Sequence, residues 1–499
     1  MPYNKPIVLI NPPVAELPGS QIFVTTMPLG IAYIAAYLLK KGFRVKVIDA
    51  LGLGLEKVSG WKHGLRLRGL TIGEIVKSIP NESELICIST NFTSQHKVYI
   101  DLVSRLRERF PKKKIIIGGN EATANYKRFL KPEGADYAVL GEAEETMLKL
   151  ANALSKKDSA KAIEAIDGIA YRKNGKIAVR KKKGFIKNLD MLPFPARHLF
   201  PLENYWKAKR GHGPVNKRFT AIISSRGCPY NCTYCSSSVF WNRHWAARKP
   251  ENFVREMQHC IEKYGITEFE IEDDNLTLDI ERAKKIFRLI KEKKLGITWT
   301  TPNGVRPEHL DIETLQLMKD SGCTLLVLAP ESGSQRILKE VYNKRIDLEN
   351  IAAVAKNCSR LGIKTTAFFV VGLPVEREDD RQKTKAYLKR LARIGVDEVG
   401  VFPCIPYPNT EVRKRYFKGS IKGIDSLNIG TVPEWYPNSR AVNNYVKQLY
   451  ITFLLYKAVF HPVNVLKMLF DVISNRQSIK MERELINWKN RLLKGSWFS

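Results

Sequence analysis

The sequence predicts an α/β protein with two successive parallel sheets and a helical C-terminal region. Residues 1–156 and 216–410 alternate short apolar runs with longer amphipathic runs, the pattern of strands buried on both faces and joined by helices. Residues 157–215 break this pattern, and in residues 411–499 the apolar residues recur at helical spacing. The chain has 499 residues, 44% of them hydrophobic, which is enough for two or three domains with separate cores.

Residues 1–156 contain five strand-like runs separated by helical stretches. The runs are residues 6–11, 44–50, 85–90, 114–119 and 137–142, and the helical stretches are 30–42, 97–110 and 144–156. Strands that alternate with helices form a parallel sheet covered on both faces. We therefore expect a Rossmann-like domain with its ligand at the carboxyl ends of the strands.

Residues 157–215 are expected to form a connector between the two α/β segments. Asn174-Gly175 stands between two short strand-like runs, which is a strong signal of a β-hairpin. The stretch LPFPARHLFP at 192–201 is rich in proline and aromatic residues. We interpret this composition as a segment packed between domains.

Residues 216–410 predict a partial (β/α)6 barrel of the TIM type. Six strand-like runs lie at 219–225, 268–274, 297–303, 324–332, 365–374 and 398–406, with amphipathic stretches between them. Barrels of this kind place their chemistry at the carboxyl ends of the strands. The motifs described next fall at such ends.

Three cysteines lie close together after the first of these strands. Cys228, Cys232 and Cys235 are spaced C-x3-C-x2-C. A structural zinc site would need four ligands, and the sequence offers no second cysteine pair and only His244 nearby. Three thiolates from one loop suit a four-iron cluster with one open iron position. The other five cysteines stand singly and are expected to be small buried hydrophobic residues.

The triplet, with the aromatic residue Tyr234 before its third cysteine, resembles the signature of the radical S-adenosylmethionine (SAM) superfamily. The resemblance implies that Cys228, Cys232 and Cys235 bind a [4Fe-4S] cluster, with Tyr234 beside the cofactors. It also implies that the methionine group of SAM chelates the fourth iron. One-electron cleavage of SAM then gives a 5′-deoxyadenosyl radical that abstracts hydrogen from an unactivated C–H bond.

The same resemblance assigns SAM contacts to the ends of the barrel strands. It implies that Glu272 and Asp273 meet the ammonium group of SAM and that Glu331 and Ser332 meet its ribose and carboxylate. It also implies that Gly372 lies where the backbone approaches the adenine, which explains a missing side chain. Taken singly, each carboxylate is more typical of a helix N-cap or a solvated loop charge than of a functional site. Their recurrence at strand ends favours function.

Several motifs of the first domain resemble the cobalamin-binding class of radical SAM enzymes. They are INPP (10–13), PLGIAYIAAYLLKKGFRVKVID (28–49), IGGNEAT (117–123), DYAVLGEAEET (136–146) and LPFPARH (192–198). The resemblance implies that the nucleotide tail of cobalamin lies near a set of small and polar residues. This set is Thr90, Asn91, Gly118, Gly119 and Gly141.

The sequence departs from the best-known cobalamin fold at one point. It contains no Asp-x-His-x-x-Gly motif, so no histidine of that motif can serve as the lower axial ligand of cobalt. The alternative to a cobalamin domain is a Rossmann-like module that binds nothing or only docks the barrel.

The resemblance implies a reaction in which one SAM methylates cobalt and a second SAM is cleaved at the cluster. The substrate radical then takes the methyl group, so we expect C-methylation driven by an electron donor such as ferredoxin or flavodoxin. Ring formation or rearrangement of a lipid or tetrapyrrole remains the alternative, because the motifs do not separate these outcomes. A non-catalytic cobalamin carrier is a third class, and it would leave the cysteine triplet without a purpose.

The charge of the chain points to an anionic partner. The 82 Lys and Arg residues against 50 Asp and Glu residues give a net charge of +32, which suits nucleic acid, anionic lipid or an acidic protein. The basic residues are spread over every domain and no RNA-binding motif is present, so an RNA-modifying enzyme is the less favoured alternative.

The C-terminal segment gives a hint about the substrate. Residues 441–499 hold nine Lys and Arg against three Asp and Glu, interleaved with aromatic and aliphatic residues. A helix of this composition can lie on an anionic membrane surface, and a solvated helical cap over the barrel is the alternative. We therefore expect a lipid or isoprenoid substrate at a membrane surface. The sequence shows no leader and no run of eighteen apolar residues, so we expect a cytoplasmic enzyme peripheral to the membrane.

Overall fold

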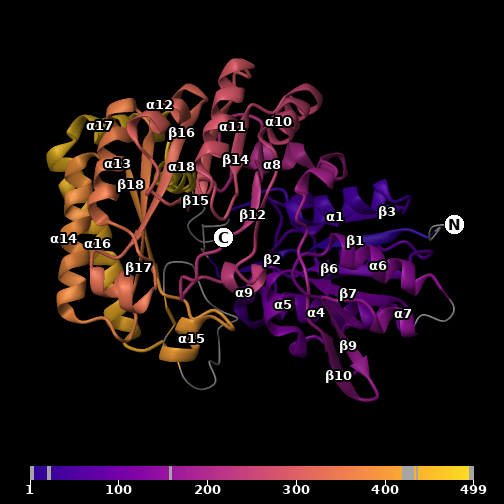
Figure 1. The fold of residues 1–499 in the computed structure, drawn as a ribbon. Coiled ribbons are helices and arrows are strands. Elements are labelled where there is room, and N and C mark those ends of the chain that lie inside the picture. The colour runs from indigo at the N-terminus through magenta and orange to yellow at the C-terminus, as the bar shows by residue number, and fades with distance from the viewer. Residues whose placement is uncertain (1–4, 19–23, 157–159, 418–431, 434–435, 494–499) are drawn as a thin grey trace.

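The computed structural model describes residues 5–18, 24–156, 160–417, 432–433 and 436–493. Two α/β units lie side by side, and residues 439–473 lie at the end of the second unit away from the first (Figure 1). Parts of the predicted connector (157–159) and of the predicted helical region (418–431, 434–435 and 494–499) lie outside the described residues.

The first unit is built on a seven-stranded sheet with the order β10-β9-β8-β7-β6-β1-β3. Its parallel strands are β1 (Ile7–Asn11), β3 (Val45–Asp49), β6 (Leu85–Ser89), β7 (Lys114–Gly118) and β8 (Tyr137–Val139). These are the five predicted strands. The chain leaves β1 for β3 at the edge and then returns past β1 to β6, so the strand order reverses between β1 and β6. Ligands of doubly wound folds bind at such a point, beyond the carboxyl ends of the strands.

Helices cover both faces of this sheet, because successive residues of each buried strand point to opposite sides. Ile7 and Leu9 of β1 face the core shared with α1 (Leu29–Lys40) and α6 (Glu144–Leu154). Val8 and Ile10 face a second core with α3 (Ile72–Lys77) and α4 (His96–Arg109). Shorter elements complete the unit: α2 (Ala50–Leu53), α5 (Asn120–Asn125), α7 (Ala160–Glu164), and a small sheet of β2 (Val14–Glu16), β4 (Val58–Gly60) and β5 (Arg66–Arg68).

The predicted hairpin forms, but it belongs to the first sheet. Strands β9 (Ile169–Lys173) and β10 (Lys176–Arg180) are joined by Asn174 and Gly175, both with positive φ. Strand β9 pairs antiparallel with β8, so the hairpin extends the sheet where we expected a separate connector. The physical reason is that the outer edge of β8 carries backbone groups that need partners. After the hairpin, α8 (Leu202–Ala208) leads into the second unit.

The second unit is the predicted six-stranded partial barrel. Its strands run parallel and in chain order, namely β11 (Phe219–Ile222), β14 (Glu268–Ile271), β15 (Thr298–Val305), β16 (Cys323–Glu331), β17 (Lys364–Val371) and β18 (Glu398–Pro403). The helices between them are α10 (Pro250–Tyr264), α11 (Ile280–Glu292), α12 (Ile312–Asp320), α13 (Leu348–Leu361) and α14 (Glu378–Ile394). All six strands therefore end at one rim, which faces the first unit.

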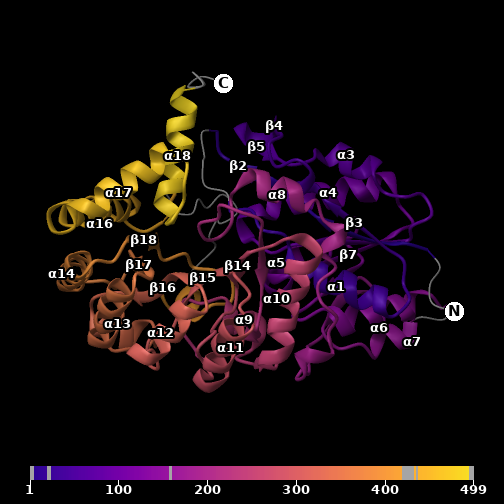
Figure 2. The ribbon, with the colours of Figure 1, turned by 90° about the horizontal axis from the view of Figure 1, so that it is seen from above.

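The C-terminal region is helical, as predicted, and lies against the barrel. It contains α15 (Glu411–Tyr416), α16 (Ser439–Phe460), α17 (Pro462–Ile473) and α18 (Lys480–Leu493). Helices α16 and α17 meet at an angle of 111°, and Pro462 is the first residue of α17 (Figure 2). Among the described residues no single helix is long and apolar enough to cross a membrane, although this bent pair passes the same test as a unit.

Candidate active site

The three cysteines lie in a loop held closed at its base by a two-stranded ribbon. Strands β12 (Ser225–Gly227) and β13 (Trp245–Ala247) pair antiparallel, and the short helix α9 (Ser237–Trp241) lies inside the loop. Gly227 has a φ of 80°, and a Cβ at this position would lie 2.1 Å from the carbonyl oxygen of His244. Only glycine therefore allows the ribbon to close directly before Cys228.

The thiols of this loop differ from the other cysteines of the chain. Cys228, Cys232 and Cys235 are partly exposed, whereas the five remaining cysteines are buried, as predicted. Burial raises the pKa of all three thiols, to about 12 for Cys235. Iron binds thiolates, so a bound cluster would have to offset this effect. Three partly exposed thiols on a single loop are the ligands that a cluster with an open iron position needs.

A mononuclear metal site is not formed in the part of the chain that the structure describes. No group of three His, Cys, Asp or Glu side chains there is placed to hold a single ion. His244, the residue considered as a fourth zinc ligand, stacks on Phe185 with ring centroids 5.1 Å apart.

Tyr234 connects the cysteine loop to the end of β16. Its hydroxyl donates to Glu331 Oε1 at 2.7 Å, and Lys344 Nζ donates to the same oxygen at 2.6 Å. Glu331 has a φ of 63°, a conformation that is uncommon outside glycine and is held here by these partners. Tyr234 and Glu331 thus brace the loop. Ser332, the next residue, is buried and bonds to Thr384 Oγ1 at 3.1 Å.

The carboxylates after β14 have separate positions. Asp273 is buried and accepts hydrogen bonds from Ser224 N and Ser224 Oγ, both at 2.6 Å, and from Ser225 Oγ. It therefore anchors the strand that leads into the cysteine loop. Its neighbours Glu272 and Asp274 both line a cavity instead, and Asp274 was not among the predicted residues.

Both cavity-facing carboxylates also have partners. Glu272 lies 3.1 Å from His212 Nδ1, and Asp274 Oδ2 accepts from Gly227 N at 3.1 Å. Burial raises the pKa of Asp274. Glu272 is thus the predicted SAM contact that the structure leaves facing a cavity.

Gly372, at the end of β17, is required by a neighbouring helix. It has a φ of 84°, and a Cβ there would lie 2.6 Å from Val442 of α16. Its carbonyl accepts from Tyr436 Oη at 3.0 Å. In this structure the group that excludes a side chain at Gly372 is therefore α16, and the approach to the adenine of SAM stays a prediction.

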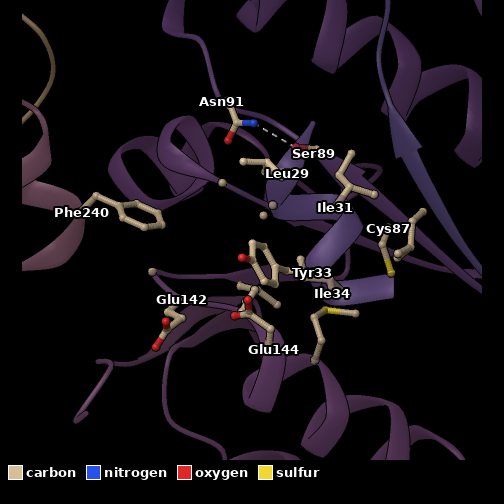
Figure 3. Close-up of a pocket in the computed structure, with 18 of the residues that line it drawn as sticks. Leu29, Ile31, Tyr33, Ile34, Cys87, Ser89, Asn91, Glu142, Glu144 and Phe240 are labelled. Carbon is tan, nitrogen blue, oxygen red and sulfur yellow. Dashed lines mark hydrogen bonds between the residues drawn. The ribbon is translucent and has the colours of Figure 1, made fainter. Parts of the chain in front are cut away.

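A first cavity lies at the carboxyl ends of the first sheet and reaches the cysteine loop (Figure 3). Its empty volume is about 1100 Å³. Aliphatic side chains from β1, β6, β7 and α1 form much of the wall: Leu9, Ile10, Ile88, Ile116, Ile117, Leu29, Ile31 and Ile34. Barrel residues close the other side, namely Ile223, Ser225, Arg226, Phe240, Trp241, Glu272 and Asp274. The cavity is therefore shared between the two units.

Four of the five residues predicted to hold the cobalamin tail line this cavity. They are Asn91, Gly118, Gly119 and Gly141. Gly119 has a φ of 112°, and a Cβ there would lie 2.5 Å from Asn91 Oδ1. The fifth residue, Thr90, is fully buried behind the wall and bonds to the carbonyl of Gly118. A large apolar cavity with bare backbone at its rim fits the bulky tail of cobalamin, and none of its described lining residues is histidine.

A second cavity opens on the other side of Asn91 and Phe240, which line both cavities. Its empty volume is about 1430 Å³. Tyr234 and Ser236 of the cysteine loop, Phe402 at the end of β18 and Phe92 of the first unit are among the residues around it. The cysteine loop therefore stands between the first cavity and the second.

A buried ion-pair network joins the two units and was missed by the sequence analysis. Arg226, two residues before Cys228, donates to Glu142 Oε1 at 2.6 Å and to Glu144 Oε1 at 2.7 Å. Its guanidinium also lies 4.8 Å from the ring centre of Tyr33. Burial raises the pKa of Glu142, Arg226 opposes this and the charge of Glu144 adds to it. The one signal in the sequence was the pair of acidic residues directly after a strand end.

These features together define an enzyme that binds large cofactors between a Rossmann-like unit and a partial barrel. Comparison with known families gives a match of residues 222–388 to the Radical SAM superfamily and of residues 20–151 to the B12 binding domain. A cytidylyl-2-hydroxyethylphosphonate methyltransferase of Streptomyces wedmorensis is 33% identical over 399 residues, which cover 74% of this chain and 73% of the relative. The chain belongs to the radical SAM superfamily, among the members that carry a B12-binding domain.

Two further proteins are similar to this chain over two thirds of its length or more. An anaerobic magnesium-protoporphyrin IX monomethyl ester cyclase of Synechocystis is 28% identical over 339 residues, 67% of this chain and 62% of the relative. The fold is similar to the solved structure of the radical SAM methyltransferase TsrM from Kitasatospora setae, with cobalamin and a [4Fe-4S] cluster bound. The match covers 82% of this chain and 77% of the TsrM chain. Its TM-score is 0.64 at 16% identity, which shows a common fold. The chain is a radical SAM enzyme, and its cofactors are a [4Fe-4S] cluster, SAM and cobalamin.

Proposed function

We propose that the enzyme transfers a methyl group to an unactivated carbon of a lipid or isoprenoid substrate at a membrane surface. The observation that carries the proposal is the position of the cysteine loop between the glycine-rimmed first cavity and the second cavity. When bound, the cluster with SAM supplies a radical that abstracts hydrogen, and cobalamin supplies the methyl group. A substrate in the second cavity would lie next to both.

The residues of the chain supply geometry and keep water away. Tyr234, braced by Glu331, fixes the cysteine loop at the end of β16. Phe92, Phe240 and Phe402 place apolar surface around the second cavity, where a radical must be protected from solvent. Apolar walls favour a hydrocarbon part of a substrate over a charged one. They are the support within the site for a lipid or isoprenoid.

We propose separate roles for four of the residues that the family resemblance assigned to SAM. Glu272 faces the first cavity and takes the role of the ammonium contact, while Asp273, Glu331 and Ser332 act as positioning residues through their buried partners. We further propose that a small electron-transfer protein such as ferredoxin or flavodoxin reduces the cluster.

The test is an anaerobic assay with reduced enzyme, SAM carrying a deuterated methyl group, and a lipid extract as the substrate source. Methyl transfer predicts a deuteromethylated lipid, together with 5′-deoxyadenosine and S-adenosylhomocysteine in equal amounts. The proposal fails if 5′-deoxyadenosine accumulates with a modified lipid that carries no label, because the deuterated methyl group would then have left with the methionine released from SAM.

Ring formation is the second candidate function. The cyclase of Synechocystis, with 28% identity over 67% of this chain, favours it. The same assay separates the two candidates, because a cyclase consumes SAM to 5′-deoxyadenosine without forming S-adenosylhomocysteine. A product without the label would support ring formation.

A further inference from the structure

A large apolar stripe lies exposed along the C-terminal helices. Ten of the twenty exposed large hydrophobic residues in the described chain fall between residues 451 and 473. They are Ile451, Leu454, Leu455, Val459 and Phe460 of α16 and Val463, Leu466, Leu469, Phe470 and Ile473 of α17. Their exposed fractions run from 40% for Leu454 to 72% for Val459. We call this set the apolar stripe.

The stripe is separate from the faces of these helices that pack on the barrel. Val446, Leu449 and Phe453 of α16 are buried against the barrel, on the opposite side of the helix from Ile451 and Leu455. A soluble helix normally turns polar residues outward, and α16 does so only in its first half. From Ile451 onward its outer face is apolar, and the stripe continues across the bend into α17. A contiguous exposed patch of this kind marks an interaction surface.

Basic residues border the stripe. Lys447 is exposed one turn before Ile451 on the same face of α16, and Lys467 is exposed beside Leu466 on α17. Arg393 of α14 is also exposed and stacks its guanidinium over the rings of Tyr456 and Phe460, at 5.1 and 5.2 Å. Asp471 is the acidic residue on α17. The surroundings of the stripe are therefore mainly positive, which matches an anionic partner.

We propose that the apolar stripe and its basic border dock the enzyme on the surface of an anionic lipid bilayer. Apolar residues on one face with lysine and arginine at its edge are the composition of helices that lie in the headgroup region. Helices α16 and α17 bend by 111° relative to each other, and they lie beside α14 and β18, at the end of the barrel away from the first unit (Figures 1 and 2). Docking there leaves the cofactor cavities uncovered.

The docking surface deepens the proposed function, because a membrane-bound enzyme meets lipid substrates directly. The test of the docking surface measures vesicle binding and not methyl transfer. The docking surface and the proposed methyl transfer can therefore fail independently of each other. The full-length, reconstituted enzyme is sedimented with vesicles of phosphatidylglycerol and phosphatidylcholine, or of phosphatidylcholine alone. We expect binding to the anionic vesicles to be at least about tenfold stronger, and to weaken as salt is added.

Two variants separate the apolar and the electrostatic contributions. Leu455→Glu/Val459→Glu/Leu466→Glu is expected to weaken anionic-vesicle binding by about tenfold or more, because three inserted side chains become charged. Lys447→Gln/Lys467→Gln is expected to weaken it about thirtyfold, since each lysine near an anionic surface contributes roughly 1 kcal/mol and about 1.4 kcal/mol is a factor of ten. The matched control, Leu53→Glu/Met191→Glu/Ile312→Glu, changes equally exposed apolar residues elsewhere and should bind like the wild type.

Three results would overturn the docking surface. The first is equal binding to both kinds of vesicle. The second is wild-type binding by both stripe variants, with their fold verified by circular dichroism. The third is a wild-type dimer in sedimentation velocity that the glutamate variant dissociates, without any vesicle binding, because the stripe would then be an interface between two copies of the chain.

Discussion

The two sides of the cofactor site are built from different groups. On the barrel side, polar side chains bond to one another and to the cysteine loop, as Asp273 does to Ser224 and as Tyr234 does to Glu331. On the side of the first unit, the wall is mainly aliphatic, with Tyr33, Glu142 and Glu144 among the exceptions, and its rim is backbone at Gly119 and Gly141. The difference teaches that a cluster with fixed ligands needs a braced loop, whereas a large organic cofactor is held by the shape of a cavity.

The largest loss of activity is expected on the barrel side of the site, when the three cysteines of the loop are replaced. Cys228→Ala/Cys232→Ala/Cys235→Ala should lose the bound iron and lower activity by about a thousandfold or more, because the five remaining cysteines are buried and cannot replace them. Iron analysis of anaerobically purified protein measures this. Cys260→Ala, a change at a buried cysteine, should keep its iron. If the triple variant retained its iron, these cysteines would not be the ligands of the cluster, and the barrel side would not differ from the first unit in the way described.

The next effect concerns the network that joins the two sides. Arg226→Met leaves Glu142 and Glu144 buried without their cation, so we expect the free energy of unfolding to fall by about 3–5 kcal/mol. Denaturant unfolding of the full chain measures the loss.

The matched control is Lys285→Met, because Lys285 pairs with Glu251 on the surface with both side chains more than half exposed. This change should cost at most about 1 kcal/mol. If the two variants lose the same stability, the buried network does not hold the units together.

A smaller effect, on cobalamin binding, is expected on the side of the first unit. Gly119→Ala places a Cβ 2.5 Å from Asn91 Oδ1 at a φ of 112°, which strains the rim of the first cavity by about 1–3 kcal/mol. The dissociation constant of cobalamin, followed by its visible spectrum, should rise about tenfold. Gly73→Ala, where nothing lies within 4 Å, is the control. Unchanged cobalamin binding by Gly119→Ala would show that the rim does not shape the site.

The smallest effect is a pH dependence inside the barrel. Burial, and then the negative charge of Glu272, raises the pKa of Glu270 to about 8. The folded state therefore binds a proton that the unfolded state has lost at pH 7, so the stabilisation present at low pH disappears as the pH rises toward 8.

Glu270→Gln should remove this loss, and its melting temperature should exceed that of the wild type by a few degrees at pH 8.5, roughly 2–4 °C per kcal/mol. The difference should shrink at pH 5. Glu313→Gln, at an exposed position, should follow the wild type. A constant difference between wild type and Glu270→Gln at all pH values would mean that Glu270 does not titrate in this range.

The sequence was sufficient to predict the strands of both parallel sheets and to separate the three loop cysteines from the five buried ones, because apolar runs and cysteine spacing are local patterns. It could not assign the carboxylates of 272–274, since neighbouring residues after a strand point in different directions and only their partners decide their roles. Arg226 and Glu142 are 84 residues apart, so no local pattern joins them. The apolar stripe was also hidden, because helical spacing is the same whether a face lies against the barrel or toward solvent.

One chain is expected to bind two metal cofactors, the [4Fe-4S] cluster at the cysteine loop and cobalamin in the first cavity. Iron and cobalt content of the anaerobically purified and reconstituted enzyme, with its visible spectrum, tests this most directly. A braced loop beside a cobalamin cavity predicts about four irons and about one cobalt per chain. Iron without cobalt would contradict the claim, because the first cavity would then be a docking feature and methyl transfer would lose its carrier.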